Sequence, residues 1–292
     1  MITLISNPAA GSGRAKKVEK KAEEFLQNRN LPYKILQTAY SGHATELAKS
    51  AAEAYRPGDL LLVIGGDGTL LESVRGVRGS DLPLAVVPAG TGNDFIKSVG
   101  LPADPEAALE QILSAKPRRI DAGELNGGLF LNECGAGFDV MVLDYAEKAK
   151  RRMKGLLPYL YGVIRTIFSY QPLSMTVTAD GKTVFEGACL VVSVANGKYI
   201  GGGIPISPEA DVQSGKLELV VMRACKRGRM LRYLPGLLKG KILTFEHTEI
   251  HCRAESVSIR ADRPLRVNVD GEILNMSACD FTVLPQTLMI QM

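Results

Sequence analysis

The first 120 or so residues alternate short apolar runs with segments whose apolar residues recur at helical spacing. The apolar runs predict strands at ITLIS (2–6), YKILQ (33–37), LLLVI (60–64) and LAVV (84–87). The helical spacing predicts helices over about 12–28, 42–54, 70–77, 93–98 and 105–114. Strands and helices that alternate in this way are typical of a parallel sheet with helices on both faces.

From about Asp121 onward the pattern changes to strict alternation of apolar and polar residues. It occurs at 173–180, 257–261 and 265–269, and it indicates half-buried antiparallel strands. The Asp180-Gly181 pair between two such runs is a hairpin signal. Helical spacing returns at about 138–153, 156–168 and 229–238. We therefore expect a second, β-rich domain that contains some helices.

Composition narrows the class of protein. The chain has 292 residues, 46% of them apolar, which is enough for a sizeable core. Its net charge of +4 is too mild to indicate nucleic-acid binding. No apolar run has the length of a membrane span, and the N-terminus does not resemble a signal peptide. The five cysteines are scattered without a CxxC pair, so we expect reduced thiols in a cytoplasmic protein.

Glycine-rich turns follow three of the four predicted parallel strands: NPAAGSG (7–13), GGDGT (65–69) and PAGTGND (88–94). The carboxyl ends of parallel strands share one edge of the sheet, so the turns should lie together where such sheets bind ligands. Glycines let backbone N–H groups approach phosphate oxygens, and the helix N-termini that follow favour negative charge. Each turn alone could be an ordinary connection, and neither GxxxxGK[ST] nor GxGxxG is present. Together the turns predict a phosphate-binding edge.

Two of these turns carry a family resemblance. GGDGTLLE (65–72) followed by VPAGTGNDF (87–95) resembles the catalytic domain of diacylglycerol kinases. Length and domain order are most similar to the soluble bacterial lipid kinases of that family, and NPAAGSG and TAYSGHATELA (38–48) fit the same pattern. GGDGT alone is shared with NAD kinases, whereas PAGTGNDF is more specific. The resemblance covers nearly the whole chain.

The resemblance implies an α/β + β fold: a nucleotide-binding domain over 1–121 and a β-sandwich, lipid-substrate domain over 122–284. In the family the last strand crosses back to the first domain, so 285–292, with LMIQM, is expected to rejoin it. The resemblance also implies which residues would hold ATP: Asn7, Pro8, Ala9, Ala10, Gly11, Thr38, Gly66, Asp67, Gly68, Thr69, Leu70, Leu71, Glu72 and Thr91.

Phosphoryl transfer requires held phosphates, Mg²⁺ and a base for the acceptor hydroxyl. Asp67 is the candidate Mg²⁺ ligand, because a carboxylate beside phosphate-binding glycines would repel the ligand unless a cation bridged them. We expect it to lie in a loop, where an aspartate could also serve the turn alone.

The candidate base lies in NVDGEIL (268–274). Alternation puts Leu265, Val267 and Val269 on one face of the preceding strand and Arg266, Asn268 and Asp270 on the other, polar face. Asp-Gly by itself is a common hairpin signal. The lipid kinase family has this VDGE segment at the cleft between its two domains, so the resemblance implies that Asp270 is the general base. Glu272 is a second candidate that spacing does not exclude. Because Asn-Gly also suits a hairpin, we expect Asp270→Asn to lower kcat with little change in stability.

One segment departs from the family pattern. The family usually has Asp-Gly late in the chain, where it helps bind a structural Mg²⁺, but here the stretch reads ADVQSGKLELV (210–220), with Ser214 in place of that aspartate. Asp211, Ser214 and Lys216 are the candidate metal site that remains. A serine with backbone carbonyls would bind more weakly than a carboxylate, and Lys216 could partly replace the cation.

Two basic stretches, EKAKRRMK (147–154) and 223–241, could be solvated surface or could attract an anionic membrane, at about 1 kcal/mol per nearby charge. The leading interpretation is a cytoplasmic, peripherally membrane-associated kinase that uses ATP and Mg²⁺ to phosphorylate a lipid hydroxyl such as that of diacylglycerol. An NAD kinase-like enzyme and a catalytically inactive nucleotide-binding regulator are the alternatives. The identity of the lipid and the formation of a homodimer stay open.

Overall fold

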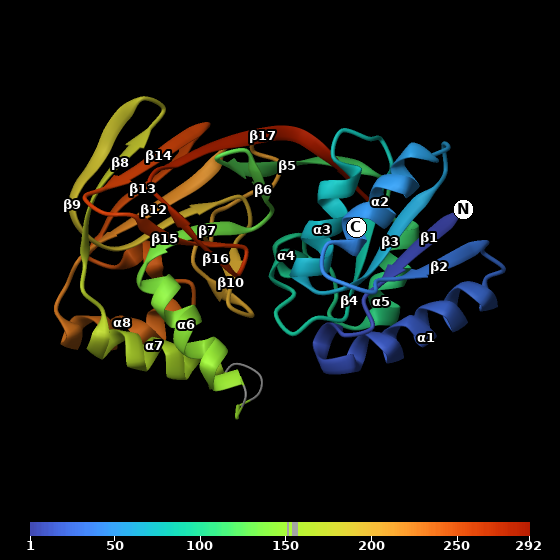
Figure 1. Cartoon of the computed structure of the whole chain (residues 1–292), viewed down its shortest axis with the longest axis horizontal. Coiled ribbons are helices and arrows are strands. Elements are labelled where there is room, and N and C mark those ends of the chain that lie inside the picture. The colour runs from blue at the N-terminus through green and yellow to red at the C-terminus, as the bar shows by residue number, and fades with distance from the viewer. Residues whose placement is uncertain (151, 154–156) are drawn as a thin grey trace. The chain divides into compact units, whose positions relative to one another are not determined.

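The computed structural model describes residues 1–150, 152–153 and 157–292 (Figure 1). It divides into two compact units, the first made of residues 1–122 with 285–292 and the second of residues 123–284. Positions 151 and 154–156 lie outside the described residues. The predicted helix over 138–153 includes position 151, and the predicted helix over 156–168 begins at position 156.

Parallel strands form the centre of the first unit, in the order β4-β3-β1-β2. Their bounds are β1 (Ile2–Ser6), β2 (Tyr33–Gln37), β3 (Leu60–Gly65) and β4 (Leu84–Pro88). The strands β1, β3 and β4 are buried along their whole length, which is why they read as continuous apolar runs.

Helices cover both faces of this sheet. On one face α1 (Arg14–Asn28), preceded by the short η1 (Ala10–Gly13), packs beside α5 (Pro105–Ser114). On the other face α2 (His43–Glu53) packs beside α3 (Asp67–Val77), and the short α4 (Asp94–Ser98) follows β4. The predicted α/β architecture is therefore confirmed.

The last strand of the chain returns to the first unit. The strand β17 (Cys279–Ile290) ends with Ile290 paired in parallel with Leu84 of β4, and the N–H of Gln291 donates to the Leu84 carbonyl at 2.9 Å. The segment LMIQM therefore lies in the first unit. The strand β5 (Arg118–Leu125) pairs with β17 as well.

Antiparallel strands build the second unit, in the order β16-β15-β7-β9-β8-β14-β17, with β12 paired to β9 and β13 paired to β12. Their bounds are β6 (Gly128–Phe130), β7 (Glu133–Gly137), β8 (Leu173–Ala179), β9 (Lys182–Ala195), β10 (Tyr199–Ile200), β11 (Ile204–Pro205), β12 (Leu217–Arg223), β13 (Thr248–Ala254), β14 (Ser256–Ala261), β15 (Leu265–Val269) and β16 (Glu272–Met276). Asp180 and Gly181 have φ of 46° and 77° and join β8 to β9, which confirms the predicted hairpin.

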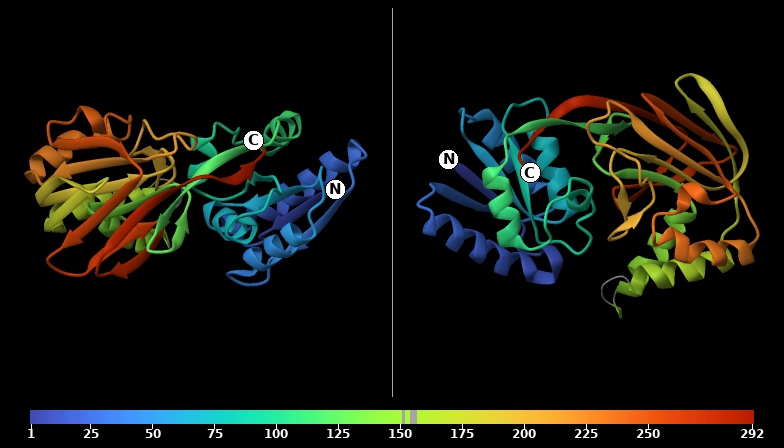
Figure 2. Two further views of the ribbon diagram at one scale, coloured as in Figure 1. Left: turned by 90° about the horizontal axis from the view of Figure 1, so that it is seen from above. Right: turned by 180° about the vertical axis from the view of Figure 1, so that it is seen from behind.

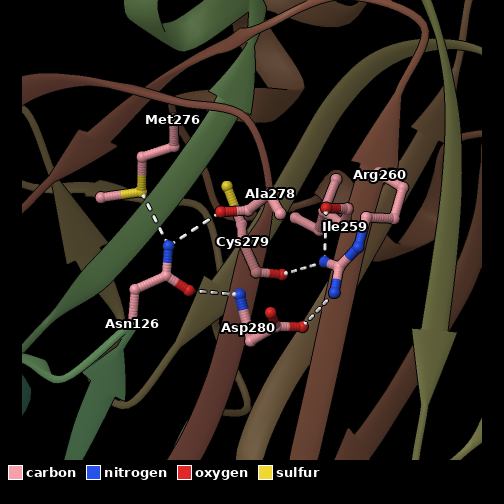
Figure 3. Close-up of polar contacts among 7 residues, drawn as sticks. All are labelled: Asn126, Ile259, Arg260, Met276, Ala278, Cys279 and Asp280. Atoms are coloured by element: carbon pink, nitrogen blue, oxygen red, sulfur yellow. Dashed lines mark hydrogen bonds and ion pairs between the residues drawn. The ribbon is translucent and has the colours of Figure 1, made fainter.

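Side-chain hydrogen bonds connect the start of β17 to the neighbouring segments (Figure 3). Asn126, in the turn after β5, donates from Nδ2 to the Ala278 carbonyl at 2.8 Å and accepts the Asp280 N–H at 2.9 Å. Arg260 of β14 pairs with the Asp280 carboxylate at 2.6 Å and donates to the Cys279 carbonyl at 3.1 Å. These contacts fix the register in which β5, β14 and β17 meet.

The helices α6 (Phe138–Lys150), α7 (Leu157–Ser169) and α8 (Arg227–Leu237) lie together on one side of the strands of the second unit, with the short η2 (Ile242–Thr244) after α8 (Figures 1 and 2). Their inner side chains form an apolar core of their own against β9 and β12, which includes Val142, Val163, Ile167, Val220 and Met230. None of the helices in the described part of the chain is long and apolar enough to cross a membrane.

Candidate active site

The three glycine-rich turns contact one another at the carboxyl ends of β1, β3 and β4. From the first turn, Asn7 Nδ2 donates to the Thr69 hydroxyl of the second at 3.0 Å. From the third turn, the N–H groups of Ala89 and Gly90 donate to the Gly65 carbonyl of the second at 2.9 and 3.0 Å. The expectation that the turns lie together at one sheet edge is therefore confirmed.

Glycine is required where these turns approach most closely. A Cβ on Gly90 would lie 2.4 Å from the Gly66 Cα, which is far inside van der Waals contact. A Cβ on Gly11, whose φ is +59°, would lie 2.1 Å from the Ala89 carbonyl oxygen. The turns thus meet main chain to main chain, and any larger residue at these positions would push them apart.

The helix α3 begins within the second turn. Gly66 is extended, with φ of −109° and ψ of −169°, and the helix starts at the next residue, Asp67. Its first turn closes where the Leu70 N–H donates to the Gly66 carbonyl at 3.0 Å, so the N–H groups of residues 67–69 lie ahead of the hydrogen-bonded part of the helix. The sequence predicts that Asp67 lies in a loop. The structure corrects this, because Asp67 is the first residue of α3. Unpaired N–H groups at a helix start form a favourable site for an anion.

The Asp67 side chain bridges two of the turns. Its Oδ1 accepts the Phe95 N–H at 3.1 Å, which ties α3 to the start of α4. Within the described residues its second oxygen, Oδ2, makes no hydrogen bond. A carboxylate oxygen is the donor chemistry that Mg²⁺ prefers, and a helix start favours anions, so Asp67 could hold Mg²⁺ beside a phosphate group.

Other residues expected to hold ATP line the same sheet edge. Thr38 follows β2, and its N–H donates to the Ser6 carbonyl at 2.9 Å. Asn7 orders the first turn, because its Oδ1 accepts the Ala9 N–H at 3.1 Å and its carbonyl accepts the Ala10 N–H at 3.0 Å. Thr91 is exposed in the third turn.

Three other residues of the ATP-binding prediction have side chains that make structural contacts. Leu70 and Leu71 are buried in the core beneath the turn, so only their main chain could reach a ligand. Glu72 Oε2 accepts the Ala44 N–H at 3.3 Å, and its carbonyl accepts the Thr45 hydroxyl at 2.9 Å. Glu72 thereby caps the start of α2.

Sequence reasoning missed Arg14. It donates from Nε to the Ala89 carbonyl at 3.3 Å and from its guanidinium to the Gly90 carbonyl, which locks the first turn to the third. Its position directly after NPAAGSG was the available signal.

In the second unit, Asp270 lies in a tight turn after β15. Its φ of 47° and the φ of 97° at Gly271 are both left-handed, as a two-residue hairpin requires. The carboxylate accepts three consecutive backbone N–H groups, from Leu131 at 2.6 Å, Asn132 at 2.8 Å and Glu133 at 2.9 Å. These donors stabilise its negative charge and hold it in one orientation.

Glu272, the other candidate base, starts β16 and is exposed. It lies two residues after Asp270 and directly opposite Val269 in the hairpin.

The predicted polar face of β15 is only partly solvated. Arg266 reaches outward and forms a bidentate pair with Asp144 of α6, at 2.5 and 2.9 Å. Asn268, by contrast, is buried. Its Oδ1 accepts the Gly271 N–H at 2.8 Å, and its Nδ2 donates to Glu133 Oε2 at 3.4 Å. The alternation was predicted correctly, but that face covers a buried polar cluster.

This cluster contains two carboxyl groups, Glu133 and Asp139, that the sequence did not reveal. Glu133 is 1% exposed and Asp139 is 8% exposed. They crowd the same side of Gly135, where a Cβ would lie 2.0 Å from Asp139 Oδ2 and 2.8 Å from Glu133 Oε1. Burial raises the pKa of Asp139 to about 6. Burial and the nearby charge of Asp139 raise the pKa of Glu133 well above its usual range.

The residues expected to bind a structural cation form a closed turn. Ser214 Oγ lies 2.9 Å from the Asp211 carbonyl and 3.0 Å from the Lys216 carbonyl, and Asp211 Oδ1 accepts the Gln213 N–H at 3.0 Å. The hydroxyl and the two carbonyl oxygens thus lie close together in one turn, and the metal site at Asp211, Ser214 and Lys216 stays a prediction. Within the described residues no group of three His, Cys, Asp or Glu side chains is placed to hold a metal ion.

Comparisons with known proteins cover the whole length of the chain. Residues 1–125 match the diacylglycerol kinase catalytic domain, and residues 132–292 match the YegS C-terminal NAD kinase beta sandwich-like domain. A diacylglycerol kinase of Bacillus subtilis is 29% identical over 285 residues, which cover 96% of this chain and 92% of that protein. A YegS-like lipid kinase of Pseudomonas fluorescens, named as probable, is 30% identical over 260 residues, covering 88% of this chain and 85% of that protein.

Solved structures agree with these matches. A crystal structure of a diacylglycerol kinase from Bacillus anthracis has a TM-score of 0.81 to this chain at 28% identity, covering 99% of this chain and 96% of that one. An NAD kinase from Archaeoglobus fulgidus, solved in complex with ATP, has a TM-score of 0.55 at 14% identity, covering 100% of this chain and 94% of that one. At that identity the likeness concerns the fold alone.

Proposed function

The chain belongs to the family of diacylglycerol kinases and YegS-like lipid kinases, and we propose that it transfers the γ-phosphate of ATP to the hydroxyl group of a lipid such as diacylglycerol. The observation that carries the proposal is the meeting of three glycine-rich turns at the start of α3. That arrangement supplies main-chain donors and a positive helix end for phosphate groups.

In this proposal the first unit binds the nucleotide. Asn7 to Gly11, Thr38, the stretch from Gly66 to Glu72, and Thr91 surround the triphosphate, largely through their main chain. The buried side chains of Leu70 and Leu71 support the turn from below. Because glycine packing and the Asn7–Thr69 hydrogen bond already fix the turns, little ordering is needed when the nucleotide binds.

Asp67 is the proposed ligand for Mg²⁺. Phe95 orients its carboxylate through one oxygen, which leaves Oδ2 as the atom for the cation. When bound, Mg²⁺ would neutralise charge that develops on the transferred phosphoryl group.

Asp270 is the proposed general base, and Glu272 is the alternative. A base must hold its carboxylate oxygen at a fixed position relative to the hydroxyl whose proton it accepts. The three backbone donors to Asp270 support that role, because they hold the carboxylate in one orientation. Glu272 is exposed and accepts no comparable set of hydrogen bonds from the residues that the structure describes.

We further propose that the enzyme works in the cytoplasm, at the surface of an anionic membrane that carries its lipid. The support is the basic character of the two stretches at 147–154 and 223–241. Arg151 and Lys154 of the first stretch lie outside the described residues.

The proposal can be tested with the purified protein, radiolabelled ATP and Mg²⁺. Diacylglycerol, phosphatidylglycerol and a sphingoid base in detergent micelles would be offered in parallel with NAD⁺. We expect the label to appear in a lipid, and an Asp262→Asn variant, which changes an exposed aspartate, to keep that activity. Label in NAD⁺ alone would instead identify an NAD kinase-like enzyme. Nucleotide binding without transfer to any acceptor would favour the inactive regulator.

A further inference from the structure

The helix α7 exposes a continuous apolar face. The exposed fractions of its large apolar side chains lie between 39% and 60%: Leu157 60%, Leu160 39%, Tyr161 39%, Ile164 41% and Phe168 58%. Positions 157, 160 or 161, 164 and 168 recur every three or four residues, which places these side chains along one side of the helix. Single exposed apolar residues are ordinary, but a contiguous row of this kind marks a surface that contacts a partner.

This row is not needed to fold the helix onto the protein. The opposite side of α7, which includes Gly162, Val163 and Ile167, is buried. Gly162 allows α7 to approach α6 closely, since a Cβ there would lie 2.4 Å from the Val142 carbonyl oxygen. The helix α7 therefore has apolar side chains on two sides, but only one side packs against the protein. The exposed apolar side would be buried only by contact with another apolar partner.

The helix α7 and the sequence on either side of it contain basic residues and no acid, whereas the neighbouring α6 carries Asp144, which pairs with Arg266, and the exposed Glu147. No Asp or Glu occurs in the sequence between Glu147 and Asp180. Arg165, next to Ile164 on the exposed side, lies 5.6 Å from the centre of the Tyr145 ring, and Lys148 of α6 lies 5.9 Å from the same ring. Two cations therefore flank the apolar row on its α6 side.

The neighbouring helix α8 continues the same character. No acid occurs between Glu218 and Glu246, and α8 exposes Leu231 at 42% and Leu238, just after its end, at 51%. Glu246 forms an ion pair with Arg229 at 2.6 Å, so the negative charge of Glu246 is neutralised. Arg227 and Arg232 are exposed and carry no ion pair within the described residues.

We propose that the exposed row of α7 inserts its apolar side chains into the boundary between headgroups and acyl chains of a bilayer that contains anionic lipid. Arg165, Lys148 and the basic residues of α8 then contact lipid phosphates, each adding about fivefold to the affinity. The inference rests on the proposed function, because a lipid kinase must meet its acceptor at a bilayer. A second copy of the chain fits this face less well, since it would bring basic surface against basic surface.

Vesicle binding tests the surface without relying on catalysis. Sedimentation with phosphatidylcholine vesicles, with and without phosphatidylglycerol, would compare the wild type with an Ile164→Ser, Phe168→Ser double variant. We expect the wild type to prefer the anionic vesicles and the double variant to bind them at least about tenfold more weakly. Leu274→Ser, which changes an equally exposed apolar residue on β16, is the matched control and should retain vesicle binding.

The charges are tested separately. Arg165→Glu should weaken binding to anionic vesicles and reduce its sensitivity to salt, whereas Lys182→Glu in the β8–β9 hairpin should do neither. Equal binding of the wild type and the double variant would overturn the proposal. The proposal would also be overturned if light scattering showed that the wild type is a dimer and the double variant a monomer while both bind vesicles equally. The exposed row would then bind a second copy of the chain.

Activity measurements separate this inference from the proposed function. On a short-chain diacylglycerol dissolved in water, the double variant should match the wild type, because neither residue belongs to the catalytic turns. Loss of activity there as well would overturn a purely membrane-docking role. A wild type that binds anionic vesicles through α7 but phosphorylates no lipid would refute the proposed function and leave the docking surface standing.

Discussion

The turns that carry Asp67 and Asp270 both place an aspartate beside a glycine near the end of a strand, yet they hold its side chain differently. Asp67 accepts one backbone N–H, from Phe95. Asp270 accepts three, from Leu131, Asn132 and Glu133. The Asp67 carboxylate is oriented through one oxygen, and its other oxygen accepts no hydrogen bond from the described residues. The Asp270 carboxylate connects the turn after β15 to the residues at the start of β7.

An aspartate can therefore be dispensable to the fold at one position, Asp67, and important to it at another position of the same chain, Asp270. A carboxylate with a single donor can lose its charge at small cost, since an amide oxygen still accepts one hydrogen bond. A carboxylate with donors on both oxygens cannot, because an amide presents an N–H₂ group to one of those donors. Activity and stability should therefore separate at Asp67 and change together at Asp270.

The largest expected effect is on the activity of Asp67→Asn. If Asp67 holds the cation that neutralises the transition state, a contribution of several kcal/mol is lost and kcat falls by about 10⁴-fold or more. The free energy of unfolding should change by less than about 1 kcal/mol, because the amide oxygen still accepts the Phe95 N–H. Lipid phosphorylation and chemical denaturation would be measured side by side, with Asp262→Asn as the control. Full activity in Asp67→Asn would remove the metal role.

Asp270→Asn should show the combined effect. Removal of a general base lowers kcat by about 10²–10⁴-fold. The sequence alone suggested that stability would hold, since Asn-Gly suits a hairpin. The structure corrects that expectation, because the new N–H₂ group faces a backbone donor and costs about 1–3 kcal/mol. Activity would be measured well below the midpoint of thermal unfolding, so that the fraction of folded protein is the same for both proteins.

Glu272→Gln is the matched variant for that experiment. Glu272 is exposed, so its replacement should leave stability within about 0.5 kcal/mol of the wild type and activity nearly unchanged. A large loss in Glu272→Gln with full activity in Asp270→Asn would move the base to Glu272. Full activity in both would leave Asp270 with a structural role only.

A further expected effect concerns stability alone, and it comes from Glu133 and Asp139, the two buried acids packed beneath the Asp270 turn. Burial raises the pKa of Asp139 to about 6, and Glu133 is raised as well, so the folded chain keeps protons that the unfolded chain releases. The free energy of unfolding should fall as pH rises from the ordinary carboxyl range through about 6, by on the order of 2–3 kcal/mol.

Asp139→Asn should flatten this decline, while Glu24→Gln, which changes an exposed acid on α1, should preserve it. Urea unfolding at several pH values provides the measurement. A decline of equal slope in Asp139→Asn and the wild type would show that the pair does not set the pH dependence.

Much of the fold could be predicted from hydrophobic periodicity. The buried parallel strands appear as unbroken apolar runs, and the half-buried strand β15 appears as Leu265, Val267 and Val269 in alternation. Helix ends were less accurate. The start of α3 was placed three residues late, because Asp67 and two flanking glycines disfavour a helix by propensity, whereas the extended Gly66 permits one to start at once.

The site was predictable where main chain and glycine build it, and not where distant side chains do. The turn at 65–69 is visible as a local pattern. The burial of Asn268 and its contact with Glu133 depend on two strands that are far apart in sequence, and the alternation of β15 shows only that Asn268 opposes the core face. Likewise, apolar spacing predicted α7 but could not show that one of its apolar sides stays exposed.

The return of β17 to β4 sets an order of events on the ribosome. Residues 1–122 emerge first and include the parallel strands and their helices, but the pairing of Ile290 with Leu84 has to wait for synthesis of the entire second unit. Until then the outer side of β4 lacks its parallel partner, and unpaired strand edges invite association with other chains. During translation the nascent first unit therefore has an exposed edge that a chaperone could shield, and synthesis of residues 285–292 completes its sheet.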